Sequence, residues 1–284
     1  MSLRFGTVGA PQGTPQTGTT AAIEHIRHLG LDAFEIAWVR SVSARDESCL
    51  AMRQAAHDQD VVLSVHAPYF INLNSQTAEK MRASDARLLA AARKGYLAGA
   101  RDIVFHPGSY HGQPPEQVYR RVREKLAELI ATLHGEGVEV TLRPETMGKS
   151  AMFGTLEEVV RLSKEVQGVA PCIDVAHLHA RTGDGRFNSY DEFAAMFRLV
   201  RDELGEEALH HMHFHISGIE YSPAGERNHL MLEESDLNWR AFLQACVDFG
   251  VEGVVVTESP TQEDDALLLK AAYEELTAHP AASK

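Results

Sequence analysis

Short apolar runs rich in β-branched residues alternate with longer segments of helical periodicity along the whole chain. Eight of these runs have the length and composition of buried strands. The predicted strands are residues 3–8, 33–38, 61–68, 102–107, 138–145, 171–177, 211–217 and 252–259. Amphipathic segments follow them, and some of these end at a glycine, as at Gly30 and Gly135. The pattern predicts eight units in which a helix follows a strand.

Eight such units in series predict an α/β fold, a single (β/α)8 TIM barrel with parallel strands. A doubly wound open sheet is the alternative, and the number of units favours the barrel. The chain has 284 residues, and a barrel of this kind needs about 250. No stretch rich in Pro, Gly and Ser divides the chain, so we expect residues 1–284 to form one domain and, by default, a monomer.

The composition is that of a globular protein with a sizeable core, since 44% of the residues are hydrophobic and 24% are charged. No apolar run approaches the roughly 18 residues of a membrane span, and the first residues lack the pattern of a signal peptide. We therefore expect a cytoplasmic protein. The three cysteines are far apart in the sequence and indicate neither a disulfide framework nor a thiolate metal site.

Histidines and acidic residues stand at the ends of six consecutive predicted strands. They are His66, His106, Glu145, Asp174 with His177, the histidines of 210–215, and Glu258. In a TIM barrel the C-terminal strand ends form one rim, where the chemistry takes place, so we expect these side chains to converge. Burial of several carboxylates and imidazoles together requires a compensating cation. Zinc fits these donors, and manganese or iron accept the same set.

Four motifs resemble those of the endonuclease IV family, the zinc-dependent apurinic/apyrimidinic (AP) endonucleases of the xylose isomerase-like barrel superfamily. The motifs are VHAPYFINL at 65–73, VFHPGS at 104–109, CIDVAH at 172–177 and ESP at 258–260. The likeness runs in order along nearly the whole chain. HAPYFINL together with HPGS is its specific part.

The resemblance implies a site with three zinc ions. His66, His106 and Glu145 would hold the first ion, and Glu145 would bridge to the second. The further ligands of the second ion would be Asp174, His213 and Glu258. His177 would bind the third ion with partners from the loop after the seventh strand.

This loop departs from the family pattern, which has an Asp-Arg-His triplet there. Glu226 and Arg227 match its first two positions, but Asn228 stands where the histidine belongs and His229 follows one place later. We expect Glu226 with His229, or His229 alone, to complete the third site. The sequence LRPET, with Arg143 before Glu145, also departs from the family, and we expect it to alter the shoulder of the site.

The crowded histidines of HHMHFHISG (210–218) are sorted by strand alternation, which points His211, His213 and His215 into the barrel. The resemblance selects His213 as the metal ligand. His215, nearer the mouth, is expected to contact substrate or a metal ligand. His211 is expected to be structural, and His210 needs no function.

The resemblance implies cleavage of DNA 5′ to an abasic sugar, in which metal ions activate the attacking water. Glu145 and Glu258 are the candidate catalytic carboxylates that orient this water or accept its proton. Tyr69 and Phe70 would wedge into the duplex at the lesion, although packing onto a neighbouring helix is an equal alternative. The candidate contacts to the DNA backbone are Arg40, Lys149, Arg181 and Arg227.

The net charge of −13, from 27 basic and 40 acidic residues, argues against non-specific coating of nucleic acid but leaves room for a local basic rim.

A second enzyme class also fits part of the pattern. Sugar isomerases and epimerases of the same superfamily hold one metal with residues at the positions of Glu145, Asp174, His213 and Glu258. His66 and His106 favour the nuclease, because an epimerase with one metal does not need them as ligands.

Overall fold

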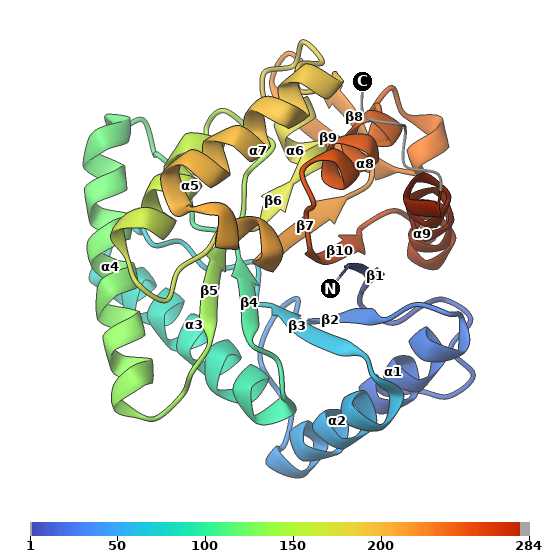
Figure 1. Ribbon diagram of the computed structural model, residues 1–284. Helices are drawn as coiled ribbons and strands as arrows, with labels where there is room; N and C mark the ends of the chain where they lie inside the picture. The colour runs from blue at the N-terminus through green and yellow to red at the C-terminus, as the bar shows by residue number, and fades with distance from the viewer. Residues whose placement is uncertain (1, 279–284) are drawn as a thin grey trace.

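A computed structural model describes residues 2–278, in which parallel strands form the centre and helices surround them (Figure 1). The barrel strands are β1 (Leu3–Val8), β2 (Ala33–Ala37), β3 (Val62–His66), β4 (Asp102–Phe105), β5 (Thr141–Pro144), β6 (Ile173–Asp174), β7 (Met212–Ile216) and β10 (Gly253–Thr257). The longer helices are α1 (Thr19–His28), α2 (Asp46–Gln59), α3 (Ala78–Ala98), α4 (Pro115–Gly135), α5 (Leu156–Glu165), α7 (Tyr190–Leu204), α8 (Trp239–Asp248) and α9 (Gln262–Ala278). The predicted TIM barrel with its eight strand–helix units is confirmed.

The strands pair in parallel in the order β5-β4-β3-β2-β1-β10-β7-β6. Parallel bridges from Leu142 to Val169 and from Glu145 to Cys172 join β5 to the segment that contains β6. The sheet therefore curls back on itself, and the C-terminal ends of its strands meet at one rim.

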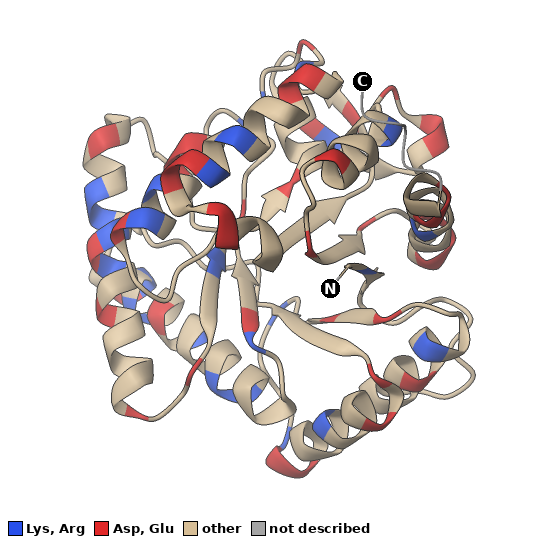
Figure 2. Cartoon of the chain, viewed as in Figure 1, with Lys and Arg blue, Asp and Glu red and all other residues tan. Residues whose placement is uncertain are grey.

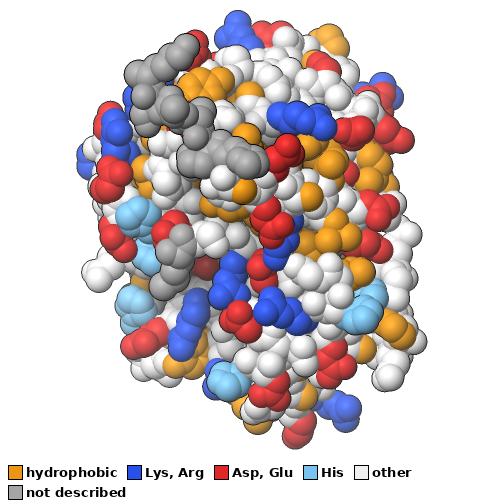
Figure 3. Space-filling view, turned by 45° about the vertical axis from the view of Figure 1, so that its right-hand side comes forward, with side chains coloured by type: hydrophobic (Ala, Val, Ile, Leu, Met, Phe, Trp, Pro, Cys, Tyr) orange, Lys and Arg blue, Asp and Glu red, His pale blue; other side chains and the backbone are white. Residues whose placement is uncertain are grey.

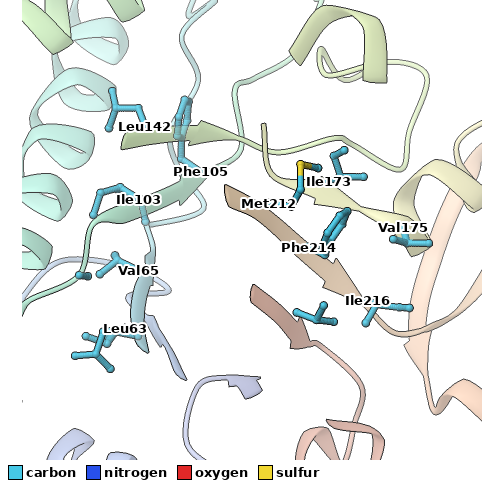
Figure 4. Close-up of a cluster of buried hydrophobic side chains, with 14 of the residues drawn as sticks. Leu63, Val65, Ile103, Phe105, Leu142, Ile173, Val175, Met212, Phe214 and Ile216 are labelled. Carbon is cyan, nitrogen blue, oxygen red and sulfur yellow. The ribbon is translucent and has the colours of Figure 1, made fainter. Parts of the chain in front are cut away.

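The core between strands and helices consists of strand side chains that alternate with those facing the barrel interior. Figure 4 shows such residues from several strands, among them Val65, Ile103 and Phe214. The Phe214 ring lies 6.0 Å from the Phe197 ring of α7 and 5.1 Å from the Phe242 ring of α8. This agrees with the alternation predicted for this strand, in which His213 and His215 face the barrel interior and the residues between them face the helices.

Two features after β5 differ from the predicted pattern. The strand predicted over 171–177 ends at Asp174, and the short helix α6 (Val175–Ala180) begins immediately after it. Asp174 caps this helix, because its Oδ1 accepts a hydrogen bond from the backbone N–H of His177 at 2.7 Å. After β7, the predicted loop contains an antiparallel hairpin of β8 (Gly218–Ser222) and β9 (Gly225–Leu230). Short 3-10 helices, η1 (Glu206–His211) and η2 (Leu232–Glu234), flank this region.

Charged residues stand mainly on the helices and loops of the outer layer (Figure 2). On the face seen in Figure 3, basic and acidic side chains are intermixed. None of the described helices is both long enough and apolar enough to cross a membrane. Many of the buried polar side chains lie inside the barrel, at its C-terminal rim.

Candidate metal centre

Glu145 lies at the centre of the rim and is fully buried. Its Oε2 is 3.3 Å from His66 Nε2 and 3.2 Å from His106 Nε2. Its Oε1 is 3.0 Å from His177 Nδ1. β3, β4 and β5 are neighbours in the sheet, so the ends of three adjacent strands place the first predicted ligand group together.

A second ligand group shares Glu145 with the first. Ligand atoms of Glu145, Asp174, His215 and Glu258 all lie within 4.8 Å of one another. His215 Nδ1 is 3.6 Å from Glu258 Oε1 and 3.8 Å from Glu145 Oε1. Glu145 is therefore placed to bridge two cations, and the histidine of the second group is His215.

His213, the ligand expected from the resemblance, lies elsewhere. Its Nε2 makes a hydrogen bond of 2.9 Å with Glu35 Oε2 in the barrel interior, and both side chains are fully buried. Alternation puts His213 and His215 on the same face of β7, but His215 is two residues closer to the rim. The assignment of His213 to the second metal group is thus replaced by His215.

The third predicted group lies between α6 and the hairpin. His177 Nε2 is 3.2 Å from Glu226 Oε2, and the ring of His229 is 5.8 Å from that of His177. A Cβ on Gly148 would lie 2.0 Å from Glu226 Oε2, so the loop after β5 approaches this carboxylate closely. The structure therefore places Glu226 in contact with His177, and it places the ring of His229 near that of His177.

A β-bulge explains why His229 replaces the residue at the family position. Tyr221 pairs with Glu226 and Glu220 pairs with Asn228, so Arg227 is the extra residue between them. Without this extra residue, Glu226 and Asn228 would share a face of the strand. Instead Asn228 is exposed and donates a hydrogen bond to Glu220 at 2.7 Å, while His229 faces the site.

Hydrogen bonds outside the ligand groups fix three imidazole rings in the same way. Nδ1 of His66 lies 2.9 Å from the Ala67 carbonyl oxygen, and Nδ1 of His177 and of His229 each lie 3.0 Å from a carbonyl oxygen. A carbonyl accepts but cannot donate, so each Nδ1 carries a proton and Nε2 is the nitrogen left for a metal. This arrangement is typical of histidines that bind metals.

Several buried polar atoms of the centre have no hydrogen-bond partner within the protein. They are both carboxylate oxygens of Glu145, Asp174 Oδ2, Glu226 Oε2 and His215 Nδ1. Unpaired buried acceptors are costly, and divalent cations bound at these ligand groups would satisfy them. The donor set of imidazole nitrogen and carboxylate oxygen suits zinc, manganese or iron.

Burial and the mutual charges shift the pKa values of these groups. Burial favours neutral Glu145, but His106 and the other imidazoles outweigh it and hold the pKa of Glu145 well below its ordinary value. Burial also opposes protonation of His66, yet Glu145 raises the pKa of His66 to about 9. Burial raises the pKa of Asp174. Protons thus balance the carboxylates here, and a metal would have to displace them.

β2 carries a buried carboxylate that the sequence pattern did not lead us to predict as part of the centre. Glu35 stands in the otherwise apolar run AFEIAW, and it is fully buried. Its Oε1 lies 2.9 Å from His215 Nε2, and its Oε2 accepts a hydrogen bond from Ser64 at 2.7 Å. A carboxylate inside an apolar strand requires partners, and this is what the pattern could have indicated.

Two other expectations about the surroundings of the site are wrong. Arg143 lies at the opposite end of the barrel, where it pairs with Asp102 at 2.5 Å and donates to the His211 carbonyl oxygen at 2.8 Å. It does not shape the shoulder of the rim. His211 belongs to η1 and is exposed rather than buried below His213, and its Nε2 lies 3.1 Å from Glu207.

The cysteines were expected to stand apart from any metal site. All three are buried and free, and Cys172 lies beside the centre, with Sγ within 4.8 Å of ligand nitrogens of His213 and His215. Burial raises the pKa of Cys172 to about 12, so this side chain is a neutral thiol.

Tyr69 and Phe70 project at the rim, with 48% and 63% of their surface exposed. The Tyr69 ring lies 5.4 Å from the ring of His66 and 5.3 Å from that of His106. Phe70 also contacts α3, because the guanidinium carbon of Arg87 lies 6.0 Å from the centre of its ring, yet more than half of its surface stays exposed. The structure therefore leaves both side chains available to a ligand that covers the mouth.

The four candidate backbone contacts differ in their surroundings. Arg40 is exposed. Lys149 lies 3.3 Å from Glu226, and Arg227 lies 3.1 Å from Glu220, and both of these cations are at least half exposed. Each of these three could turn to a phosphate.

Arg181 is engaged within the protein. Its guanidinium donates hydrogen bonds of 2.6 to 2.9 Å to the carbonyl oxygens of Met147, Lys149 and Met152. These bonds brace the loop after β5. They occupy three of its five N–H donors, so Arg181 is the least free of the four candidate cations.

Comparisons with known proteins agree on the fold. The model of the family described as xylose isomerase-like TIM barrel matches residues 23–279. An uncharacterized protein of Methanocaldococcus jannaschii is 38% identical over 274 residues, which are 96% of this chain and 98% of that protein. A probable endonuclease 4 of Listeria welshimeri is 30% identical over 171 residues. That match covers 55% of this chain and 56% of the relative, so the chain spans about half the length of this endonuclease.

Two solved structures illustrate the range of functions on this fold. A D-tagatose 3-epimerase-like protein has a TM-score of 0.75 at 17% identity, over 99% of this chain and 100% of that one. Endonuclease IV from Thermus thermophilus has a TM-score of 0.72 at 21% identity, over 96% of this chain and 99% of that one. At these identities the likeness shows a shared fold and does not separate a nuclease from an epimerase.

Proposed function

The chain belongs to the xylose isomerase-like TIM barrel family, and on this premise we propose that it is an AP endonuclease. As such it is a metal-dependent hydrolase that cleaves DNA 5′ to abasic sites in base excision repair. One observation carries the proposal, which is the number of ligand groups at the rim. Two groups share Glu145, and the pair of His177 with Glu226 lies directly beside them.

Three zinc ions are assigned to these groups, and manganese or iron would accept the same donors. The first set is His66, His106 and Glu145, and the third is His177, Glu226 and His229. The second set is Glu145, Asp174, His215 and Glu258. When bound, such ions supply a water of lowered pKa and positive charge opposite the oxygens of a phosphodiester.

The two candidate catalytic carboxylates have different roles. Glu145 is fully buried among the imidazoles, so it serves as the shared ligand. The Glu258 side chain is 13% exposed, and the carbonyl oxygen of this residue orients His229. Glu258 is therefore the carboxylate that a water entering from the mouth reaches, and it orients this water or accepts its proton.

The rim suits a substrate larger than a sugar. Tyr69 and Phe70 present apolar rings beside the first ligand group, where they can stack in the gap left by a missing base. Arg40, Lys149 and Arg227 are the cations available for the flanking phosphates. Lys149 and Arg227 now pair with glutamates, so each would exchange an exposed ion pair for a phosphate contact.

A sugar isomerase or epimerase is the second candidate, and one observation favours it. Glu145, Asp174, His215 and Glu258 by themselves form a four-ligand set that would hold a single metal. In such an enzyme, His66 and His106 would contact a sugar hydroxyl instead of a second ion. The position of the metal is common to both candidates, and the number of metals separates them.

A duplex with a single abasic-site analogue tests the proposal. The metal-loaded protein should nick the strand 5′ to the lesion and leave a 3′-hydroxyl, and chelation or Glu145→Gln should abolish nicking. Metal analysis of the same sample should give about three ions per chain. One ion per chain together with epimerisation of a ketohexose, and no nicking, would replace the nuclease by the epimerase.

A further inference from the structure

Glu35 is a fully buried carboxylate on the inner side of the metal centre, and it belongs to none of the three ligand sets assigned above. Its Oε2 accepts hydrogen bonds from Ser64 Oγ at 2.7 Å and from His213 Nε2 at 2.9 Å. Its Oε1 lies 2.9 Å from His215 Nε2. One oxygen therefore takes two donors, and the other faces His215.

His215 is oriented differently from the other histidines of the centre. His66, His177 and His229 place Nδ1 against backbone carbonyl oxygens and turn Nε2 toward the site. His215 turns Nδ1 toward Glu145 and Glu258, and its Nε2 points to Glu35. A side-chain carboxylate thus takes the place that a carbonyl oxygen has for the other three rings.

The contact decides which nitrogen of His215 carries the proton. It has the distance of an ion pair without the alignment of a hydrogen bond. An unprotonated Nε2 would leave its lone pair beside a negative oxygen 2.9 Å away, whereas a proton on Nε2 places positive charge there, so the proton belongs on Nε2. Nδ1 then keeps the lone pair that a metal needs.

We propose that Glu35 is a positioning residue that fixes the tautomer and the ring orientation of His215, so that His215 binds metal through Nδ1. The inference rests on the metal centre of the proposed function, and it does not depend on which substrate is cleaved. Carboxylates behind metal-binding imidazoles typically change metal affinity by 10–100-fold. Glu35 acts in this way through His215 and touches no substrate.

Glu35→Gln is the direct test, because an amide offers one acceptor in place of two. The amide oxygen is favoured at the Oε2 position, where two donors converge, so the NH2 group would face His215 Nε2. Nε2 would then lose its proton to Nδ1, which is the nitrogen that faces the metal. Long-range 1H–15N NMR of the zinc-loaded protein should show His215 protonated at Nε2 and zinc-bound at Nδ1 in the parent chain, and the variant should lose this pattern.

Metal affinity is the second readout. Titration of chelator-treated protein with zinc alone should show one site weakened by about 10–100-fold in Glu35→Gln. Ser64→Ala is the matched control, because it removes a donor from the same carboxylate without touching the contact to His215, and its affinity should equal that of the parent. Glu35→Leu, which removes both acceptors, should weaken the same site and serves if the glutamine variant does not fold.

The outcomes separate this inference from the proposed function. Parental zinc affinity and an unchanged His215 tautomer in the folded variants would overturn the role of Glu35, even if abasic DNA is nicked. An equal loss of affinity in Ser64→Ala would also overturn it, because the effect would then be one of packing. A loss confined to the Glu35 variants would support it, even if the parent chain fails to nick DNA.

Discussion

The shared carboxylate of Glu145 predicts that one substitution removes two metals. Its two oxygens face the imidazoles of His66 and His106 on one side and the group of Asp174 and His215 on the other. Glu145→Gln should therefore abolish both of these sites. His106→Ala removes a ligand of the first group alone, so it should abolish one.

Linkage gives the size of the effect. At a free metal concentration 100-fold above the dissociation constant, each occupied site stabilises the folded state by about 2.7 kcal/mol. Glu145→Gln should thus lose about 5 kcal/mol of metal-dependent stabilisation, twice the loss in His106→Ala. At roughly 2–4 °C per kcal/mol, the metal-induced rise in Tm should fall by about 10–20 °C in the first variant and by half as much in the second.

The assay compares each variant with its own metal-free form. This reference matters because Glu145→Gln also changes the metal-free protein, in which the carboxylate lies among three imidazoles. Calorimetric Tm values are measured with chelator and with zinc, and bound zinc is counted. His57→Ala, at a histidine whose side chain is 83% exposed, is the control and should behave like the parent. Equal losses in Glu145→Gln and His106→Ala would refute the bridging role.

Three further predictions concern the third site, the core and a helix cap. Gly148→Ala should remove one bound metal, because its Cβ would lie 2.0 Å from Glu226 Oε2. Gly135→Ala is the control: its Cβ meets nothing within 4 Å, so the variant should bind as many metal ions as the parent in the same metal analysis. Phe214→Ala should lower the free energy of unfolding, measured in urea, by about 3–5 kcal/mol, because this ring packs against α7 and α8. The number of bound metal ions should not change, and a change would contradict the outward orientation of Phe214. The Ser189 hydroxyl and nearby backbone N–H donors lower the pKa of the Glu192 carboxyl to about 2. Its contribution to stability is therefore present above the ordinary value of 4.5 and is lost as the pH falls toward 2. Glu192→Gln should therefore cost about 1–2 kcal/mol near neutral pH, after allowance for solvent screening of this partly exposed group, and a cost that stays constant down to pH 3 would contradict this assignment.

The sequence predicted where the strands lie and which of their ends carry chemistry. Alternation of apolar and polar residues depends on local geometry, so all eight strands and the outward direction of Phe214 could be predicted. His66, His106 and Glu145 could be predicted as neighbours, because adjacent parallel strands end at one rim.

Other assignments failed because they depend on position along the barrel axis. His213 and His215 face the same way, and the register of β7 against β10 and β6 decides which of them reaches the rim. Arg143 points inward as well, but near the N-terminal end of the barrel. Arg181 looks like a free cation in the sequence until three carbonyl oxygens are seen around it.

The sequence by itself thus determined the barrel and the set of residue types at its rim, because both follow from short-range periodicity repeated eight times. The tertiary structure decided which atoms meet. A bulge at Arg227 turned His229 toward His177 in place of Asn228. Glu35 came within 2.9 Å of His215, from which it is separated by most of the chain. Such contacts depend on register and closure of the sheet, and no local pattern encodes them.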